Sequence, residues 1–425
     1  MINKKKFFRA MAALIIGGSF LIFPTANAEV QTYIGEGEYL MNDFETPEVA
    51  KQRAKNRAEQ NAQEQAGIYL ESYSHMKNFD LLNDEIITIS SGIMKILDVK
   101  FNQDVVADGK GILIHVTIKA EIDSDNMDKW LNKSIEQRRQ INSQMENLRQ
   151  ENAKQEATIA DLKSQLAAGT ITQEQAKQDF VQKDKVFTFY QKLQEGLNFC
   201  AAENFQQAVQ SFTDAINIFP RNAYGYFDRG TAYNELHENQ KALDDFNKSI
   251  EIAPNHFAYN NRGKINFEMK NFNAALEDFN KAIQVNPNDA TAYYNRGTVY
   301  FAVQNFNLGM KDFDKAISLQ PNNVKFYVKR SAGYYVSGKM DSALKDLNTA
   351  IKVDPTYYES YSLRGEVYTA LKDYKAALKD FNKSIELNPN DAETYAQRGN
   401  IYKLLGDNKN AQKDFATAKK MGYTE

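Results

Sequence analysis

The chain has 425 residues, of which 42% are hydrophobic and 25% are charged, a composition typical of a folded protein with two or three domains. Its 52 basic and 55 acidic side chains leave a net charge of −3, which argues against a nucleic-acid-binding protein because such proteins carry a basic excess. The single cysteine, Cys200, excludes an intrachain disulfide and a zinc site built from cysteines. The four histidines lack the spacing of a metal-binding helix. We therefore expect neither a metal nor a cofactor.

Residues 1–28 have the pattern of a secretory signal peptide. A positively charged start precedes an uncharged, mostly apolar run over 11–23, and Ala26-Asn27-Ala28 supplies a small-x-small cleavage pattern. The alternative is an uncleaved anchor, but this run would rise only about 20 Å as a helix, against a hydrocarbon core of roughly 30 Å. We expect a protein of the periplasm or cell envelope, or a secreted one, with no transmembrane segment in the mature chain.

Residues 29–125 predict a small α+β domain. A strand is expected over 30–40, with Gly35 and Gly37 as bulge points. Thr46-Pro47-Glu48 marks a helix start, because it combines a capping residue, a proline at the first helical position and an acid. The helix that follows has a stripe of small residues at every fourth position, which lets it lie close to a sheet: Ala50, Ala54, Ala58, Ala62 and Ala66.

The rest of this domain reads as a short helix over 84–93 and a strand pair. Apolar and polar residues alternate over 112–122, which predicts a strand with one buried face. Its partner is expected over 94–101, joined through a turn containing Asp108-Gly109. The pattern of a strand and then an alanine-striped helix resembles, weakly, the N-terminal domain of flagellar assembly protein T, which implies a role in the cell envelope. His115 is expected to be a solvent-facing strand residue rather than a ligand.

Residues 126–188 predict one or two long helices. From Met127 to Leu166, eight of twelve heptad positions are apolar, which indicates a coiled coil of about 40 residues. Two interpretations remain open. The segment 127–166 forms a homo-oligomer, or the helix turns at Gly169-Thr170 and folds back on a second helix capped by Thr172.

Residues 189–425 form an internal repeat. Six of the eight prolines recur at intervals of 33 or 34 residues: Pro220, Pro254, Pro287, Pro321, Pro355 and Pro389. Seven units follow, in which small residues recur at positions 8, 20 and 27 and large apolar residues, mostly aromatic, at positions 11 and 24. Asn266 is the exception at position 11. Each unit predicts two helices, with proline at position 32 ending the second one. The units are 189–222, 223–256, 256–289, 290–323, 324–357, 358–391 and 392–425.

This pattern resembles the tetratricopeptide repeat. The resemblance implies a mainly α fold, a right-handed α-solenoid here preceded by the small α+β domain and the long coiled-coil-like helix. It also implies a concave groove, lined by the first helices, that binds peptide segments of partner proteins.

Two positions set this array apart from the usual repeat. Position 7 is arginine and position 23 aspartate in every unit but the first, where both are absent. The joint loss predicts a structural Arg–Asp pair rather than a basic stripe for anions. The pairs are Arg229–Asp245, Arg262–Asp278, Arg296–Asp312, Arg330–Asp346, Arg364–Asp380 and Arg398–Asp414.

Aromatic and polar side chains fall on the positions that line the groove in the resembled family. They suit an extended peptide with apolar anchors, although some of the rings would instead fill the core between repeats. The residues predicted to line the groove are Phe227, Asn260, Lys264, Phe267, Tyr294, Phe301 and Tyr335.

No motif for a nucleophile, a phosphate loop or a metal-dependent hydrolase occurs in the sequence. We therefore expect no catalytic residues and a protein that is not an enzyme. The expected function is that of an exported adaptor or scaffold that binds a protein or peptide partner. The alternative is a structural periplasmic coordinator of envelope or cell-division assembly that acts as a coiled-coil oligomer.

Overall fold

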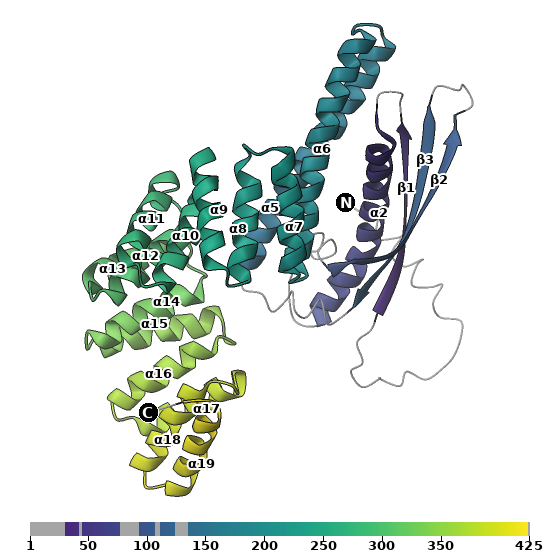
Figure 1. The fold of residues 1–425 in the computed structure, drawn as a ribbon. Helices are drawn as coiled ribbons and strands as arrows, with labels where there is room; N and C mark the ends of the chain where they lie inside the picture. Colours follow the sequence, from purple (N-terminus) through teal and green to yellow (C-terminus); the bar gives the residue numbers. More distant parts are fainter. Residues whose placement is uncertain (1–29, 42–44, 77–92, 107–110, 124–134, 424–425) are drawn as a thin grey trace, which may run out of the picture. The chain divides into compact units, whose positions relative to one another are not determined.

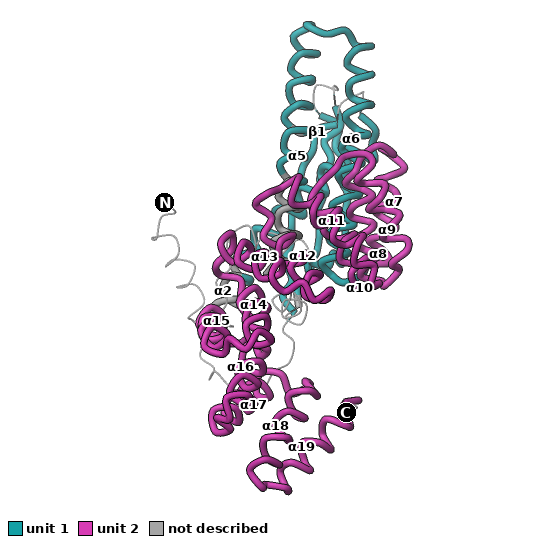
Figure 2. The backbone as a smooth tube through the Cα atoms, turned by 90° about the vertical axis from the view of Figure 1, so that its left-hand side faces the viewer, with its two compact units in different colours: residues 1–204 teal, residues 205–425 magenta. Residues whose placement is uncertain are grey.

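The computed structural model describes residues 30–41, 45–76, 93–106, 111–123 and 135–423. The signal-peptide pattern of 1–28, the Asp108-Gly109 turn and most of the helix expected over 84–93 lie outside the described residues. The chain divides into two compact units, residues 1–204 and 205–425, which are coloured separately in Figure 2.

The first unit contains a three-stranded antiparallel sheet in the order β1-β3-β2, made of β1 (Val30–Met41), β2 (Lys95–Val105) and β3 (Ile112–Asp123). Helix α2 (Pro47–Met76) begins at the predicted start and lies along β1 and β3 (Figure 1). All five alanines of the small-residue stripe are completely buried. All but Ala66 pack with Tyr39, Ile114 and Val116 into the core of this layer.

Gly35 and Gly37 do not form bulges, contrary to the prediction. Each pairs in continuous register with β3, and the irregularity lies in β2, between Ile96 and Asp98. Their role is close approach: a Cβ on Gly35 would overlap the carbonyl oxygen of Ala58, and one on Gly37 that of Ala54. Glycine in the strand and alanine in the helix therefore let the two backbones touch.

The long segment after the sheet is an antiparallel helical hairpin of α5 (Ile135–Ala167) and α6 (Gln173–Ala201). The chain turns at Gly169, whose φ is +69°, and Thr172 caps α6 in a capping box with Gln175. The heptad residues Ile159 and Leu162 pack against Ala176 and Phe180 of the same chain. The segment therefore folds back on itself, as in the second of the two interpretations. Helix α6 continues across the domain boundary predicted between residues 188 and 189.

A buried ionic cluster joins the hairpin to the sheet layer inside the first unit. Arg53 of α2 is 1% exposed and forms ion pairs with Glu45 and with Asp184 of α6. The Arg53 guanidinium also lies 4.7 Å from the ring centre of Phe187. Burial raises the pKa of Asp184, and the attraction of Arg53 opposes that shift.

The second unit consists of paired helices that follow the 34-residue period. First helices alternate with second helices, and the glycine at position 8 admits the ring at position 24 of the same repeat: a Cβ on Gly297 would lie 2.8 Å from Cε1 of Phe313. Among the described residues no helix is both long and apolar enough to cross a membrane. The helices are α7 (Phe205–Ile218), α8 (Ala223–Glu235), α9 (Asn239–Ile252), α10 (His256–Glu268), α11 (Phe272–Val285), α12 (Ala290–Ala302), α13 (Phe306–Leu319), α14 (Val324–Val336), α15 (Met340–Val353), α16 (Tyr358–Ala370), α17 (Tyr374–Leu387), α18 (Ala392–Leu404) and α19 (Asn408–Lys420).

Gly37→Ala is expected to loosen the first unit, because the new methyl group collides with the backbone of α2 at Ala54. Overpacking of this kind costs about 3 kcal/mol. Hydrogen exchange followed by mass spectrometry should show faster exchange across α2 and unchanged exchange in α7–α19. Glu36→Ala, an exposed neighbour on the same strand, is the matched control. Unchanged protection of α2 in the glycine variant would contradict the close-approach role.

Candidate binding surface of the repeat array

Each of the six predicted Arg–Asp pairs is present and joins the two helices of one repeat. Arg296 of α12 donates through Nε to Oδ2 of Asp312 at 2.8 Å and through Nη2 to Oδ1 at 2.7 Å. The closest nitrogen–oxygen distances in the six pairs are 2.5 to 2.8 Å. These are bidentate, charge-assisted contacts in a largely buried position.

The same guanidinium makes a third contact that the sequence analysis missed. Nη1 of Arg296 donates to Oδ1 of Asn280, on the second helix of the preceding repeat, at 2.7 Å. Every arginine of the set bonds position 25 of the preceding repeat in this way, so each one ties three helices together. The acceptors are Thr213, Asn247, Asn280, Asp314, Asn348 and Asn382.

Tyrosine rings flank these guanidinium groups. The Cζ atom of Arg296 lies 5.5 Å from the ring centre of Tyr293 and 6.0 Å from that of Tyr300. In the repeat where position 11 is Asn266, the amide instead donates to Asp278 at 3.0 Å. Hydrogen bonds to the aspartates raise the pKa of Arg296 and of its counterparts Arg229, Arg364 and Arg398. The arginines therefore serve the fold rather than an anionic ligand.

The first helices α8, α10, α12, α14, α16 and α18 contact one another in succession, and we call the surface they share the first-helix face. Of the rings predicted to line a groove here, Phe227 is buried and Phe267 is half-buried. Phe227 is 5% exposed in a cluster with Phe246, and Phe267 packs against Phe279 and Val299. The prediction for Phe227 is therefore corrected.

Phe301 also belongs to the packing. Its ring meets Phe306 and Phe313 at 5.3 and 5.1 Å between centroids. A Cβ on Gly333 would lie 2.5 Å from the Phe301 ring, and one on Gly309 would overlap it. Glycines on α13 and α14 thus make room for this ring, and Phe301 is half-buried, as Tyr294 and Tyr335 are.

Of the two polar residues predicted on α10, Asn260 is buried and Lys264 is exposed. Asn260 is 5% exposed and donates through Nδ2 to Oδ2 of Asp289, which also bonds Nδ1 of His256 at 2.8 Å. Lys264, one helical turn further along α10, is exposed. Of the two, Lys264 is the one placed to meet a partner.

Tyr294 and Tyr335 are half-buried. The Tyr294 ring lies against Phe326 and Phe313, with centroids 5.1 and 5.9 Å away. Burial, with the negative charge of Glu359, raises the pKa of Tyr294 to about 12. Burial and then the charge of Glu366 raise the pKa of Tyr335. Both pKa shifts thus involve carboxylates, Glu359 and Glu366, that the sequence analysis did not select.

Glu359 accepts from the Tyr357 hydroxyl, whereas Glu366 belongs to a polar network on α16 and α18. Glu366 accepts from Nε2 of Gln397 at 2.8 Å, and Ser362 shares hydrogen bonds with Gln397 and, at 2.9 Å, with Thr394. Glu366 occupies position 9 of its repeat, where Lys264 stands in the third unit. A comparison of the charge at position 9 across the repeats would have identified Glu366.

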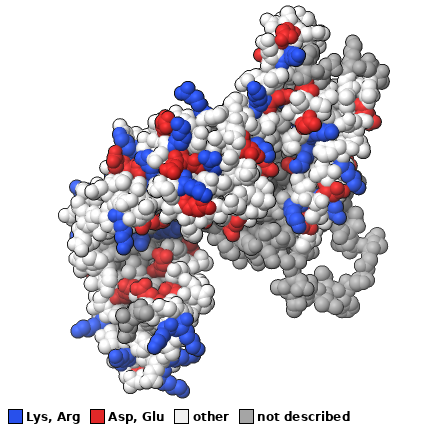
Figure 3. Space-filling model, viewed as in Figure 1, with Lys and Arg blue, Asp and Glu red and all other residues white. Residues whose placement is uncertain are grey.

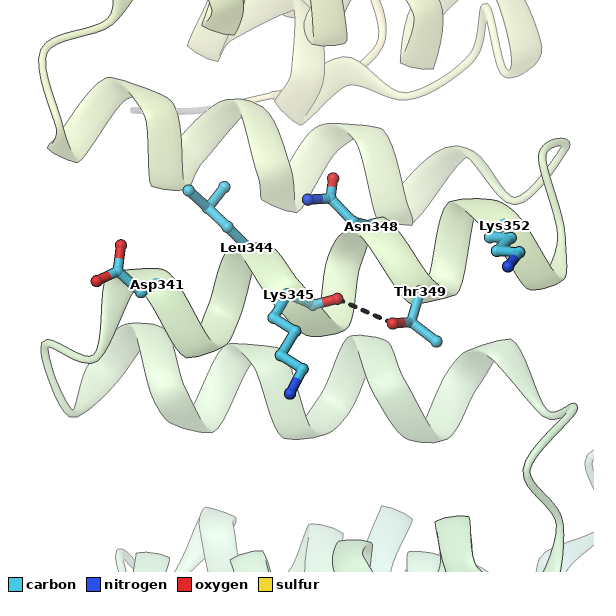
Figure 4. A pocket seen from close by; sticks show the side chains of 6 residues that line it. All are labelled: Asp341, Leu344, Lys345, Asn348, Thr349 and Lys352. Atoms are coloured by element: carbon cyan, nitrogen blue, oxygen red, sulfur yellow. Dashed lines mark hydrogen bonds between the residues drawn. The ribbon is translucent and has the colours of Figure 1, made fainter.

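A surface hollow lies along α15, away from the first-helix face, and its lining side chains all project from that one helix (Figure 4). Lys345 and Thr349 are linked only by the helical bond from the Thr349 hydroxyl to the Lys345 carbonyl. No nucleophile and base converge there. Within the described residues no group of His, Cys, Asp and Glu could hold a metal ion.

The repeats match known family models. Residues 193–257, 290–323, 358–391 and 381–413 match models described as tetratricopeptide repeat, and residues 263–304 match one described as TPR repeat. The chain therefore contains tetratricopeptide repeats, and its second unit is a solenoid of them.

Curated relatives share short stretches only. The chain is 32% identical over 59 residues to tetratricopeptide repeat protein 36 of Caenorhabditis elegans, covering 14% of this chain and 33% of the relative. It is 32% identical over 63 residues to small glutamine-rich tetratricopeptide repeat-containing protein 2 of Saccharomyces cerevisiae, covering 15% of this chain and 18% of the relative. The chain thus spans a third or less of both.

Solved structures of similar fold include a tetratricopeptide repeat protein from Parabacteroides merdae, with a TM-score of 0.48 at 23% identity over 56% of this chain and 94% of that one. YrrB, described as a TPR protein with an unusual peptide-binding site, matches with a TM-score of 0.36 at 21% identity, over 44% of this chain and 96% of that one.

Arg296→Ala and Asp312→Ala are each expected to destabilise the second unit by about 2 kcal/mol, because each leaves a charged partner without its bidentate contact. The double variant should cost less than the sum of the two. Arg296→Lys should recover less than half of the loss, since lysine cannot also reach Asn280 in the same geometry. Urea unfolding followed by circular dichroism measures the stability of all four variants. Full additivity of the two single costs in the double variant would contradict the Arg296–Asp312 pairing.

Phe227→Ala is expected to cost about 3 kcal/mol, because this ring is 5% exposed and its loss leaves a cavity. Tyr335→Ala, on the first helix α14, should cost clearly less because that ring is only half-buried. Thermal unfolding of the two variants compares them directly. Equal costs would mean that the packing described for Phe227 does not hold.

Proposed function

We propose that this chain is an exported adaptor of the cell envelope that binds segments of partner proteins on the first-helix face of its repeats. The observation that carries the proposal is which recurring residues of the repeat are used in packing and which residues of the first helices are not. The arginines, the aspartates and Phe227 are used in packing, whereas on the first helices Lys264 is exposed and Tyr335 is half-buried. A half-buried ring beside exposed polar groups is the composition of a peptide-binding surface.

The envelope location rests on the signal-peptide pattern of residues 1–28. We further propose that the sheet layer of the first unit docks elsewhere in the envelope, so that the repeats hold a partner near that point. The outward surface of this sheet is rich in polar residues, and His115 bonds there to Glu38 at 2.8 Å and to Asp104 at 3.3 Å.

The alternative is a structural coordinator of envelope or cell-division assembly that oligomerises through 127–166. Ile159 and Leu162 are already covered by Ala176 and Phe180 of the same chain. This contact covers seam residues that a second copy would need, and it favours the adaptor. Loss of the gene separates the two: division defects support the coordinator, and failure of one assembled complex supports the adaptor.

The test is co-purification from envelope extract with the C-terminally tagged chain. The variant Lys264→Ala/Tyr335→Ala should lose a partner that the unchanged chain retains. The matched control, Leu308→Ala/Lys315→Ala, alters exposed residues on the second helix α13 and should retain the partner. Retention of every partner by both variants would contradict binding at the first-helix face.

A further inference from the structure

We propose that the part of the first-helix face built by α12, α14, α16 and α18 binds a partner segment carrying lysine or arginine, with one cationic side chain placed between Tyr335 and Glu366. This inference rests on the proposed function and names the chemistry of the partner. The occupant is a protein segment rather than a small cation, because the surface combines aromatic rings with carboxylates over several helices.

Aromatic side chains provide the apolar part of this surface. Tyr294 lies on Phe326, and Tyr335 packs at the border of a cluster that contains Val328 and Leu347. Tyr357, at the start of α16, donates its hydroxyl to Oε2 of Glu359 at 2.9 Å. Ring faces next to carboxylates attract the alkyl stem and the charged end of one lysine or arginine together.

The carboxylates of this surface lack cationic partners. In the described part of the repeats, Glu359, Glu366, Asp391 and Glu393 take part in no ion pair. The buried aspartates of the arginine pairs are, by contrast, all neutralised. The lysines on these four helices, Lys325, Lys329 and Lys403, are exposed and form no ion pair within the described residues either. A cation from a partner would supply the missing charge.

Of these carboxylates, Glu366 has the environment that best suits a contact with a cation. It is half-buried, and burial, with the nearby charges of Glu393 and Asp391, raises its pKa, against the hydrogen bond from Gln397. Gln397 is itself held by Ser362, which in turn bonds Thr394. The carboxylate is therefore fixed in place while its charge remains uncompensated, so a cation gains more here than at a mobile surface acid.

The charge also changes sign along the face. Position 9 is Lys264 in the third unit and Glu366 in the sixth, and acidic side chains gather on the surface near α15 and α16 in Figure 3. A segment with a cation at one end and an acid at the other would therefore bind in a single direction. Electrostatic complementarity of this kind sets orientation and specificity.

The test uses the full chain and two fluorescein-labelled peptides, one of repeating Lys-Leu-Ser triplets and one of repeating Glu-Leu-Ser triplets, measured by fluorescence anisotropy at physiological salt. The unchanged chain should bind the lysine peptide at least tenfold more tightly. Glu366→Gln should weaken that binding about tenfold, and Glu366→Lys should reverse the preference. Glu277→Gln, which removes an exposed charge from the second helix α11, should have no effect.

Equal binding of the two peptides, no binding of either, or an equal loss in Glu277→Gln would overturn the proposal. Circular dichroism of each variant separates loss of binding from loss of folding, and Tyr335→Ala provides a second variant that leaves the carboxylates intact. A partner lost from Lys264→Ala/Tyr335→Ala but retained by Glu366→Gln would keep the adaptor and reject the cationic contact. A partner retained by both would reject the adaptor itself.

Discussion

The arginine at position 7 of each repeat is the contact on which the stacking of the second unit depends. Its guanidinium holds the aspartate of its own second helix with two hydrogen bonds and reaches the preceding second helix with a third. Tyrosine rings lie beside it. Arginine suits this position because a planar group with five donors can serve several acceptors at once, whereas lysine cannot. The array is thus tied together repeat by repeat.

This use of arginine decides what the rest of the repeat can do. The arginines and aspartates of the pairs are used in packing, and so is Phe227. A smaller set of residues on the first helices remains, of which Lys264 is exposed and Tyr335, Glu359 and Glu366 are half-buried. The proposed specificity therefore lies in the residues that the repeat pattern does not fix.

Much of this fold was predictable because the physical demands repeat at a fixed period. The prolines, the small residues and the joint appearance of Arg296 with Asp312 all follow from helix packing. The third contact, to Asn280, was missed because position 25 varies between Asn, Asp and Thr. Tyrosine at position 4, however, is constant from Tyr226 onward and could have been noticed.

The errors share one cause: a repeat position gives the direction of a side chain but not its depth. Phe227 occupies a groove position, yet its ring is 5% exposed and packs on Phe246 of the next helix. Gly35 and Gly37 were likewise read as bulges, because nothing in the strand alone shows how closely α2 approaches. In both cases the deciding residues lie on a neighbouring element, which a pattern within one element cannot reveal.

The most direct measurement of the central claim is site-specific photo-crosslinking in intact cells. A benzophenone amino acid at Tyr335 would report on the first-helix face, and one at Lys345 on the second helix α15. The account predicts a defined adduct with a partner segment from position 335 and none from position 345. Equal adducts from both positions, or an adduct from position 345 alone, would contradict binding at the first-helix face.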